Sequence, residues 1–310
     1  LIGQMPGVKN AFEACVFTFG IVQGGGAGKL LADIIVEGEP ETDSWAVDPR
    51  RYTNHVDLEY TKAKAIETYS HEYAMHFPQI QWPAGRPAKV SPIYNSLLKA
   101  GAVMGSYGGW ERADWYTNNE SLKKPANSYD RQHWFDDVSK ECNHVAEHCG
   151  VIDLTGFSRF EISGEGTSQW LETLITGRLP KIGKVGLVYF SSHKGKVLTE
   201  MTATRISEDH IWLLTGAGAY WHDRDWLNFN LPESSNIKIV DTTHDLGTML
   251  LTGPKSDLLI AKLTDEKTDN ESFPWLSHKS IKLCGEDTRI LKVSYAGEKG
   301  FEIHVHNNSM

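Results

Sequence analysis

From about residue 134 onward, apolar and polar residues alternate regularly enough to predict short helices and strands. Apolar spacings of three and four predict helices over residues 135–148, 167–175, 220–228 and 254–263. Alternating or continuous apolar runs predict strands over residues 151–154, 158–163, 187–191, 197–206, 210–215, 248–251 and 289–295. Helices and strands in this mixed order are typical of an α+β layer fold.

The first 130 residues follow a less regular pattern. Residues 14–19 predict a buried strand, residues 23–28 a glycine-rich turn, and residues 29–37 an amphipathic helix that ends at Gly38. Residues 41–130 are rich in Pro, Gly, Trp and Tyr, with one helix expected near residues 60–73. This composition favours an irregular region that links two more regular ones.

Composition and charge exclude several classes of protein. The 310 residues suffice for two or three domains, and 40% hydrophobic with 23% charged residues is typical of a globular protein. A net charge of −9 argues against nucleic acid as the main partner, because phosphate binding needs clustered Lys and Arg. No apolar run approaches the roughly 20 residues needed to span a bilayer, so no membrane partner is expected. The four cysteines form no C-x-x-C pair and fit a reducing compartment.

The glycine-rich segment invites a phosphate-loop interpretation, which fails. The G-x-x-x-x-G-K-[ST] pattern would need Gly where Gln23 stands and Ser or Thr where Leu30 stands. Two hypotheses remain: a helix N-terminus whose free N–H groups hold a phosphate or a polarised ring carbonyl, and a simple packing turn.

A short histidine motif invites a metal-site interpretation. His144, Glu147 and His148 spell H-x-x-E-H, and the two histidines lie one helical turn apart. No third ligand is identifiable, so we predict an ordinary exposed helix and no metal site.

Residues 293–303 hold the most informative candidate site. Gly297 and Gly300 bracket a turn between two expected strands, which brings Tyr295 close to Glu302. A carboxylate beside a phenol suits a pterin ring, which carries a 2-amino group next to a ring N–H. From these residues alone, a surface hairpin with a solvated glutamate stays open as the alternative.

Several segments together resemble a known family. Residues 295–302 resemble the Y-x-G-E-x-G-[FW]-E run of folate-binding aminomethyltransferases, and residues 150–164 and 167–176 resemble the opening strands and helix of that fold. Residues 5–40 resemble the last segment of the FAD-binding domain of amine dehydrogenases, with residues 48–52 as its exit, and residues 82–94 and 108–116 resemble a central linking domain. This order of modules is that of the dimethylglycine and sarcosine dehydrogenase family.

The resemblance implies the domain organisation and the chemistry. It implies the tail of an FAD-dependent oxidoreductase domain over residues 1–52, a linking domain over 53–130, and an aminomethyltransferase-like folate domain over 131–310. Because the chain starts at Leu1 and stops after an apparent strand, we expect an internal fragment with an incomplete folate domain. The cofactors implied are FAD, with only part of its site present, and tetrahydrofolate; the other small-molecule partner is an N-methylated amine.

Individual site residues also follow from the resemblance. Glu200 matches the acidic residue near the pterin N5/N10 edge and would stabilise positive charge at nitrogen; taken alone, it is as readily a solvent-facing strand residue. Tyr295 and Glu302 match the pterin contacts. The implied apolar walls of the folate slot are Phe157, Leu187 and Leu214, and the implied flavin contacts are Gly24, Gly25 and Gly26.

Three alternatives stay open at this stage. Sarcosine dehydrogenase shares the architecture, and a non-catalytic relative such as the pyruvate dehydrogenase phosphatase regulatory subunit keeps the folds without the oxidation. A free-standing aminomethyltransferase of the glycine-cleavage type fits less well, because of the match in residues 1–52. The compartment expected is the cytoplasm in a bacterium or the mitochondrial matrix in a eukaryote.

Overall fold

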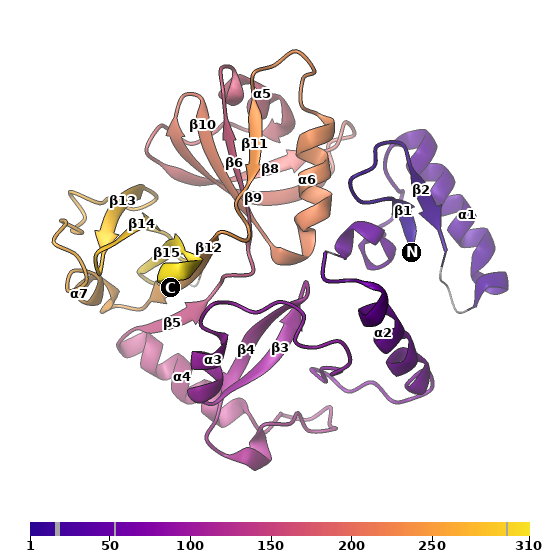
Figure 1. The fold of residues 1–310 in the computed structure, drawn as a ribbon, viewed down its shortest axis with the longest axis horizontal. Helices are drawn as coiled ribbons and strands as arrows, with labels where there is room; N and C mark the ends of the chain where they lie inside the picture. The colour runs from indigo at the N-terminus through magenta and orange to yellow at the C-terminus, as the bar shows by residue number, and fades with distance from the viewer. Residues whose placement is uncertain (16–18, 53, 296) are drawn as a thin grey trace.

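The N-terminal lobe consists of a small hairpin and one long exposed helix. The computed structural model describes residues 1–15, 19–52, 54–295 and 297–310. Strands β1 (Ile2–Gln4) and β2 (Phe12–Ala14) pair antiparallel, and helix α1 (Gly20–Glu37) lies beside them (Figure 1). Two short 3-10 helices follow, η1 (Trp45–Val47) and η2 (Pro49–Arg51).

The expected glycine turn over residues 23–28 is wrong, because helix α1 begins at Gly20 and runs through it. Gly24, Gly25 and Gly26 have no positive φ, and an added Cβ would meet nothing within 4 Å at any of them. With no neighbour forcing a bend, the backbone continues its intrahelical hydrogen bonds. The helix does end at Gly38 as expected, in the left-handed conformation. Residues 16–18 of the expected strand lie outside the described residues.

The linking lobe combines helices with one hairpin. Helix α2 (Leu58–Ser70) confirms the helix expected near residue 60, and Asp57 caps it by accepting from the Tyr60 N–H at 2.8 Å. Helix α3 (Tyr94–Lys99), the β3 (Ala102–Tyr107) and β4 (Trp110–Tyr116) hairpin and η3 (Glu120–Leu122) follow. Helix α4 (Phe135–Glu147) matches its predicted span and leads into the next sheet.

A six-stranded antiparallel sheet forms the third lobe, in the order β11-β6-β10-β9-β8-β7. Helices α5 and α6 cover one face, over a core that includes Phe160, Leu171 and Leu213. The strand and helix positions predicted from residue 158 to residue 228 are confirmed to within two residues. The elements are β6 (Ser158–Ser163), α5 (Thr167–Leu174), β7 (Ile175–Thr176), β8 (Val185–Ser191), β9 (Val197–Ser207), β10 (His210–Thr215), η4 (Ala217–Ala219), α6 (Tyr220–Phe229) and β11 (Lys238–Asp241).

A five-stranded antiparallel sheet forms the fourth lobe, in the order β13-β14-β15-β12-β5. Strand β5 precedes the six-stranded sheet in sequence and the other four strands follow it, so the third lobe is nested within the fourth. The elements are β5 (Gly150–Asp153), β12 (Leu246–Thr252), α7 (Ser256–Ile260), β13 (His278–Leu283), β14 (Glu286–Leu291), β15 (Gly300–His306) and η5 (Asn307–Ser309).

Two predicted elements in this lobe are longer than those observed. The helix expected over 254–263 shrinks to α7, and the strand expected over 289–295 ends at Leu291. The side chain of Lys292 instead turns inward and donates to the Asn270 side-chain oxygen at 2.9 Å. The predicted tight turn is therefore a longer connection between β14 and β15.

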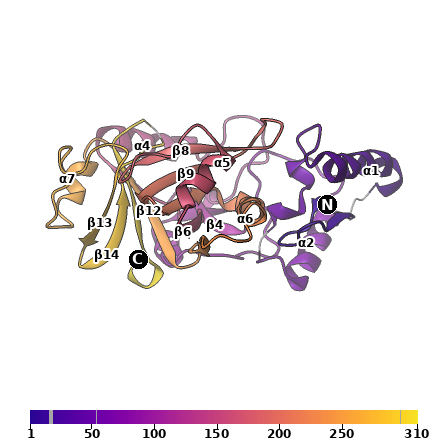
Figure 2. The same cartoon turned by 90° about the horizontal axis from the view of Figure 1, so that it is seen from above.

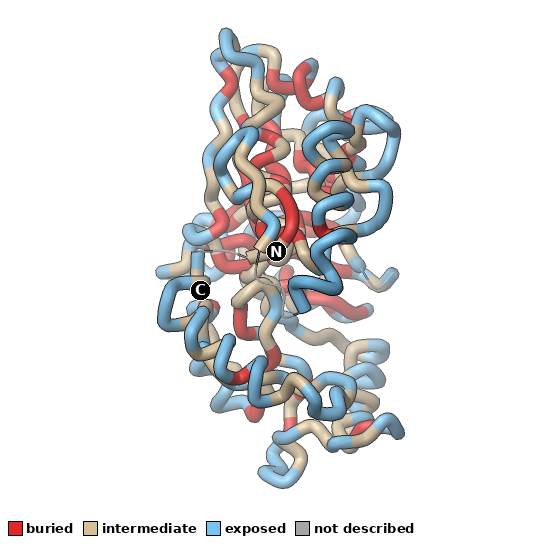
Figure 3. The backbone as a smooth tube through the Cα atoms, turned by 90° about the vertical axis from the view of Figure 1, so that its right-hand side faces the viewer, coloured by how far each residue is buried: buried red, intermediate tan, exposed pale blue. Residues whose placement is uncertain are grey.

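Burial concentrates in the two large sheets, whereas α1 is mostly exposed (Figure 3). Seen from above, the N-terminal lobe and the lobe with α7 lie at opposite ends of the molecule (Figure 2). Within the described ranges, no helix is both long and apolar enough to cross a membrane.

Candidate functional site

The face of the six-stranded sheet opposite α5 and α6 carries a row of predicted site residues. Leu187 of β8 and Leu214 of β10 both pair with Thr202 of β9, and Leu214 also pairs with Arg159 of β6. Paired residues project to the same face, and so does Glu200, two positions before Thr202. Leu214 is buried and Leu187 is 55% exposed, so the row runs from the protein interior to an open edge.

Strand β15 supplies the opposing carboxylate. Phe301 and Ile303 point into the core of the five-stranded sheet, so Glu302 projects from the other face. Glu302 is only 2% exposed. This burial contradicts the alternative of a surface hairpin with a solvated glutamate.

Tyr295 joins the two sheets. Burial of its hydroxyl, the charge of Glu302 and a hydrogen bond to that carboxylate raise the pKa of Tyr295, and a hydrogen bond from Thr202 opposes the shift. The Phe157 ring lies 6.3 Å from the Tyr295 ring, centroid to centroid. The predicted approach of Tyr295 to Glu302 is therefore confirmed, although Tyr295 as a whole is 58% exposed.

Glu200 lies at the rim of the same group. Its charge contributes to the raised pKa of Tyr295, and a hydrogen bond to Glu200 raises the pKa of Tyr189. Tyr189 pairs with Glu200 across β8 and β9. Glu200 is exposed, as in the alternative of a solvent-facing strand residue. Its side chain nevertheless lies on the same face of the sheet as Thr202, toward Tyr295.

The structure therefore brings the other five predicted folate residues around Tyr295 and its neighbour Thr202. Sequence reasoning missed Thr202, Arg159 and His304, each of which stands two positions after a predicted residue. Since side chains two apart in a strand share a face, this spacing was the available signal. Thr248, which contacts His304, carried no such signal.

A cavity of about 260 Å³ adjoins this group at Phe157. Its other walls come from the β3–β4 hairpin, including Tyr107 and Trp110, and from residues 153–156. Apolar walls with a few placed polar groups are typical of small-molecule sites.

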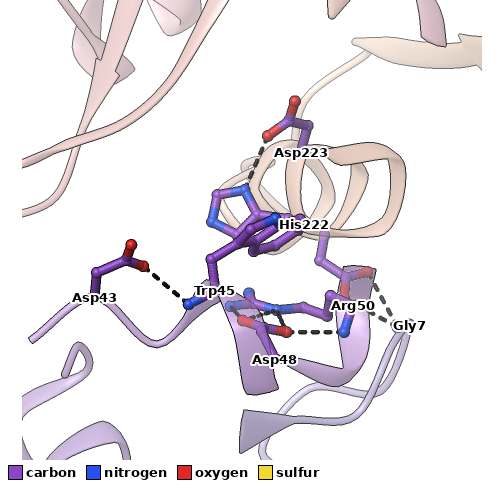
Figure 4. Close-up of polar contacts among 8 residues, drawn as sticks. Gly7, Asp43, Trp45, Asp48, Arg50, His222 and Asp223 are labelled. Carbon is purple, nitrogen blue, oxygen red and sulfur yellow. Dashed lines mark hydrogen bonds and ion pairs between the residues drawn. The ribbon is translucent and has the colours of Figure 1, made fainter. Parts of the chain in front are cut away.

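A larger cavity of about 780 Å³ lies between the N-terminal lobe and α6. Figure 4 shows the His222 ring between Asp223 and Trp45, near the ion pair of Asp48 with Arg50. The N–H of His222 Nδ1 faces Asp223 at 2.9 Å, and the His222 and Trp45 rings meet edge to face at 5.8 Å.

Strand β9 separates this cavity from the slot around Tyr295. Thr199 lines the larger cavity and donates to Asp223 at 3.2 Å, while the adjacent Glu200 projects to the opposite face. Successive residues of one strand thus face the larger cavity on one side of the sheet and the group around Tyr295 on the other.

The remaining predicted positions lie away from both cavities. Gly24, Gly25 and Gly26 are exposed on α1 and line neither one. His144 lies in the last turn of α4 and His148 follows its end, with ring centroids 4.8 Å apart. Among the residues that the structure describes, no group of three or more His, Cys, Asp or Glu side chains is placed to hold a metal ion.

Comparisons with known proteins show the family and the fold. The sequence matches the family described as "GCVT N-terminal domain" over residues 93–310 and the one described as "FAD dependent oxidoreductase central domain" over residues 37–91. It is 33% identical to "Dimethylglycine dehydrogenase, mitochondrial" of Rattus norvegicus over 98% of this chain and 36% of that protein. Identity to "Sarcosine dehydrogenase, mitochondrial" of Homo sapiens is 26%, over 98% of this chain and 38% of that protein.

The chain therefore spans little more than a third of the length of these curated relatives. Among solved structures, it is similar to the glycine cleavage system aminomethyltransferase T from Bartonella henselae, with a TM-score of 0.58 and 22% identity over 71% of this chain and 54% of that one. The expected α+β aminomethyltransferase-like fold is confirmed.

Proposed function

Because the chain belongs to the GCVT N-terminal domain family, we propose that it forms the folate-binding part of a flavin-dependent dehydrogenase. The enzyme would oxidatively demethylate an N-methylated glycine such as dimethylglycine and pass the one-carbon unit to tetrahydrofolate. The proposal includes the domain boundaries after residues 52 and 130. It also places the enzyme in the bacterial cytoplasm or the mitochondrial matrix.

One observation carries the proposal: the buried carboxylate of Glu302 lies with the more exposed Tyr295 and Glu200 where the two sheets face each other. A buried carboxylate costs free energy unless hydrogen-bond donors satisfy it. The 2-amino group and ring N–H of a pterin are two such donors, and they match the two oxygens of Glu302. Apolar surface from Phe157, Leu187 and Leu214 would hold the flat ring.

Glu200 is proposed to stabilise charge during the transfer of the one-carbon unit. Its carboxylate lies at the rim of the slot, where it can stabilise positive charge that develops on a folate nitrogen during transfer. The hydrogen bond with Tyr189 orients this carboxylate. Glu200 need not move a proton in this role.

The flavin part of the proposal rests on the family match over residues 37–91. A bound flavin would supply the two-electron oxidation of the amine. Gly24, Gly25 and Gly26 lie on an exposed helix without a turn, so no step is assigned to them.

Tetrahydrofolate binding tests the pterin site. We expect Glu302→Gln to weaken binding by roughly 10- to 100-fold, because hydrogen bonds to a charged group are worth about 1.5–3 kcal/mol. Isothermal titration calorimetry under anaerobic conditions measures the change. The matched control is Glu233→Gln at an exposed turn after α6. Equal affinity in Glu302→Gln and wild type would overturn the assignment.

A further inference from the structure

A series of buried hydrogen bonds connects Arg159 to Glu302 through Thr248 and His304. The Arg159 guanidinium donates to the Thr248 hydroxyl, which lies 2.8 Å from His304 Nδ1. His304 Nε2 lies 3.2 Å from the Glu302 carboxylate. All four residues are at most 2% exposed, and they come from β6, β12 and β15.

The directions of these hydrogen bonds follow from the groups at both ends. A guanidinium has no acceptor, so the Thr248 oxygen accepts from Arg159. An ionised carboxylate has no donor, so His304 donates to Glu302 from Nε2. A neutral imidazole with its hydrogen on Nε2 accepts at Nδ1, where the Thr248 hydroxyl donates to it.

The surroundings favour the neutral ring. Complete burial lowers the pKa of His304, opposed by the hydrogen bond and charge of Glu302, while the charges of Arg159 and Arg289 lower it further. The Trp212 and His304 rings meet edge to face, with ring centroids 4.6 Å apart. A doubly protonated ring would also make Thr248 accept twice, leaving its own hydrogen in need of another buried acceptor.

Arg159 itself is well anchored. Its guanidinium also donates to the backbone oxygens of Phe157 at 2.9 Å and Thr243 at 3.1 Å. The series of hydrogen bonds therefore starts from a fixed donor, Arg159, and ends at an acceptor, the Glu302 carboxylate.

Resting on the proposed function, we propose that Thr248 and His304 are positioning residues for pterin recognition. They hold one oxygen of Glu302 through the Nε2–H of His304 and leave the remaining lone pairs for Tyr295 and for the two N–H groups of the ligand. An ionised carboxylate offers about four acceptor positions, so this division satisfies all three partners.

The alternative is a polar network that only stabilises the contact between the sheets. Thr248→Val separates the two roles, because it removes the hydroxyl at nearly constant volume and leaves Arg159 its backbone acceptors. Thr248→Ser keeps the hydroxyl and is the matched control.

Histidine tautomers are read directly from long-range ¹H–¹⁵N correlation spectra of the ¹⁵N-labelled protein. The His304 signal is identified by its loss in His304→Gln. We expect hydrogen on Nε2 in wild type and in Thr248→Ser, and a mixture of tautomers in Thr248→Val. A wild-type His304 with hydrogen on Nδ1, or doubly protonated at neutral pH, would contradict the proposed directions of the hydrogen bonds.

Tetrahydrofolate titrations complete the test. We expect Thr248→Val to bind about 5- to 10-fold more weakly than wild type and Thr248→Ser to restore affinity, since one hydrogen bond is worth about 1 kcal/mol. Unchanged affinity in Thr248→Val beside normal wild-type binding would overturn the positioning role alone. Absence of binding in wild type would instead overturn the proposed function, while the tautomer spectra still test the bond directions. If Thr248→Val does not fold, the wild-type and Thr248→Ser spectra decide.

Discussion

Helix α1 and the segment from Tyr295 to β15 lie at opposite ends of the chain, and both are marked by glycines. In α1 only Ala27 is buried, although the helix is 18 residues long. In β15, six of the seven residues are buried, including the charged Glu302. The glycine-rich segment predicted as a turn is an exposed helix, and the segment predicted to pair Tyr295 with Glu302 holds a buried carboxylate.

The difference shows that the structural role of a glycine depends on the atoms that face its Cα. A Cβ added at Gly25 would meet nothing, whereas one added at Gly300 would lie 2.7 Å from the Val293 carbonyl oxygen. Glycine is required at position 300 by close backbone approach and is merely tolerated at position 25.

Truncating the β15 core gives the largest expected contrast. Phe301 is fully buried and its ring packs beside that of Phe273. Phe301→Ala is therefore expected to lower the free energy of unfolding by about 3–5 kcal/mol. Ile21→Ala on α1, where the residue is 100% exposed, is expected to change it by less than about 0.5 kcal/mol. Urea denaturation measures both variants. Similar losses in the two would contradict the contrast in packing.

The glycines themselves provide the next test. Gly300→Ala is expected to cost about 1–3 kcal/mol, because the new methyl group is forced against a backbone oxygen. Gly25→Ala is expected to stabilise by roughly 0.5–1 kcal/mol, because alanine favours the helix. Thermal unfolding followed by circular dichroism measures both signs. Destabilisation by Gly25→Ala would point to a close contact on α1.

Acidification gives the smallest of the three effects. His304 is buried in β15 and has a lowered pKa, so the unfolded state binds its proton first as pH falls below about 6.5. Stability is therefore lost with falling pH, by about 1.4 kcal/mol per unit of lowered pKa. The decrease between pH 7.5 and 5.5 in urea denaturation should be shallower in His304→Gln. An identical slope would show that His304 carries none of this pH dependence.

Much of the fold could be predicted from the sequence where periodicity and packing agree. The strands and helices from residue 158 to residue 228 lie where apolar alternation indicated, because each buries one face in a common core. The end of α1 was predicted, but its start was placed too late because the glycines of residues 23–28 favour a turn that no neighbouring residue enforces. The pairing of β5 with β12 had no local signal at all.

The candidate site divides in the same way. Tyr295 and Glu302 are close in sequence, and their approach follows from a connection between paired strands. The approach of Glu200 and Phe157 to Tyr295 depends on how two sheets face each other, which alternation alone does not determine. Thr248 contacts His304 only because β12 pairs with β15.

The nesting of one lobe within another has a consequence for folding kinetics. In the six-stranded sheet, strands β7 to β10 pair in chain order, whereas Asp153 of β5 pairs with Met249 of β12 across the whole intervening lobe. Since closing long loops costs entropy before contacts repay it, we expect the six-stranded lobe to form first and β5 to dock last. The slot around Tyr295 exists only after both sheets meet, so a bound ligand would stabilise that last step and slow the first step of unfolding.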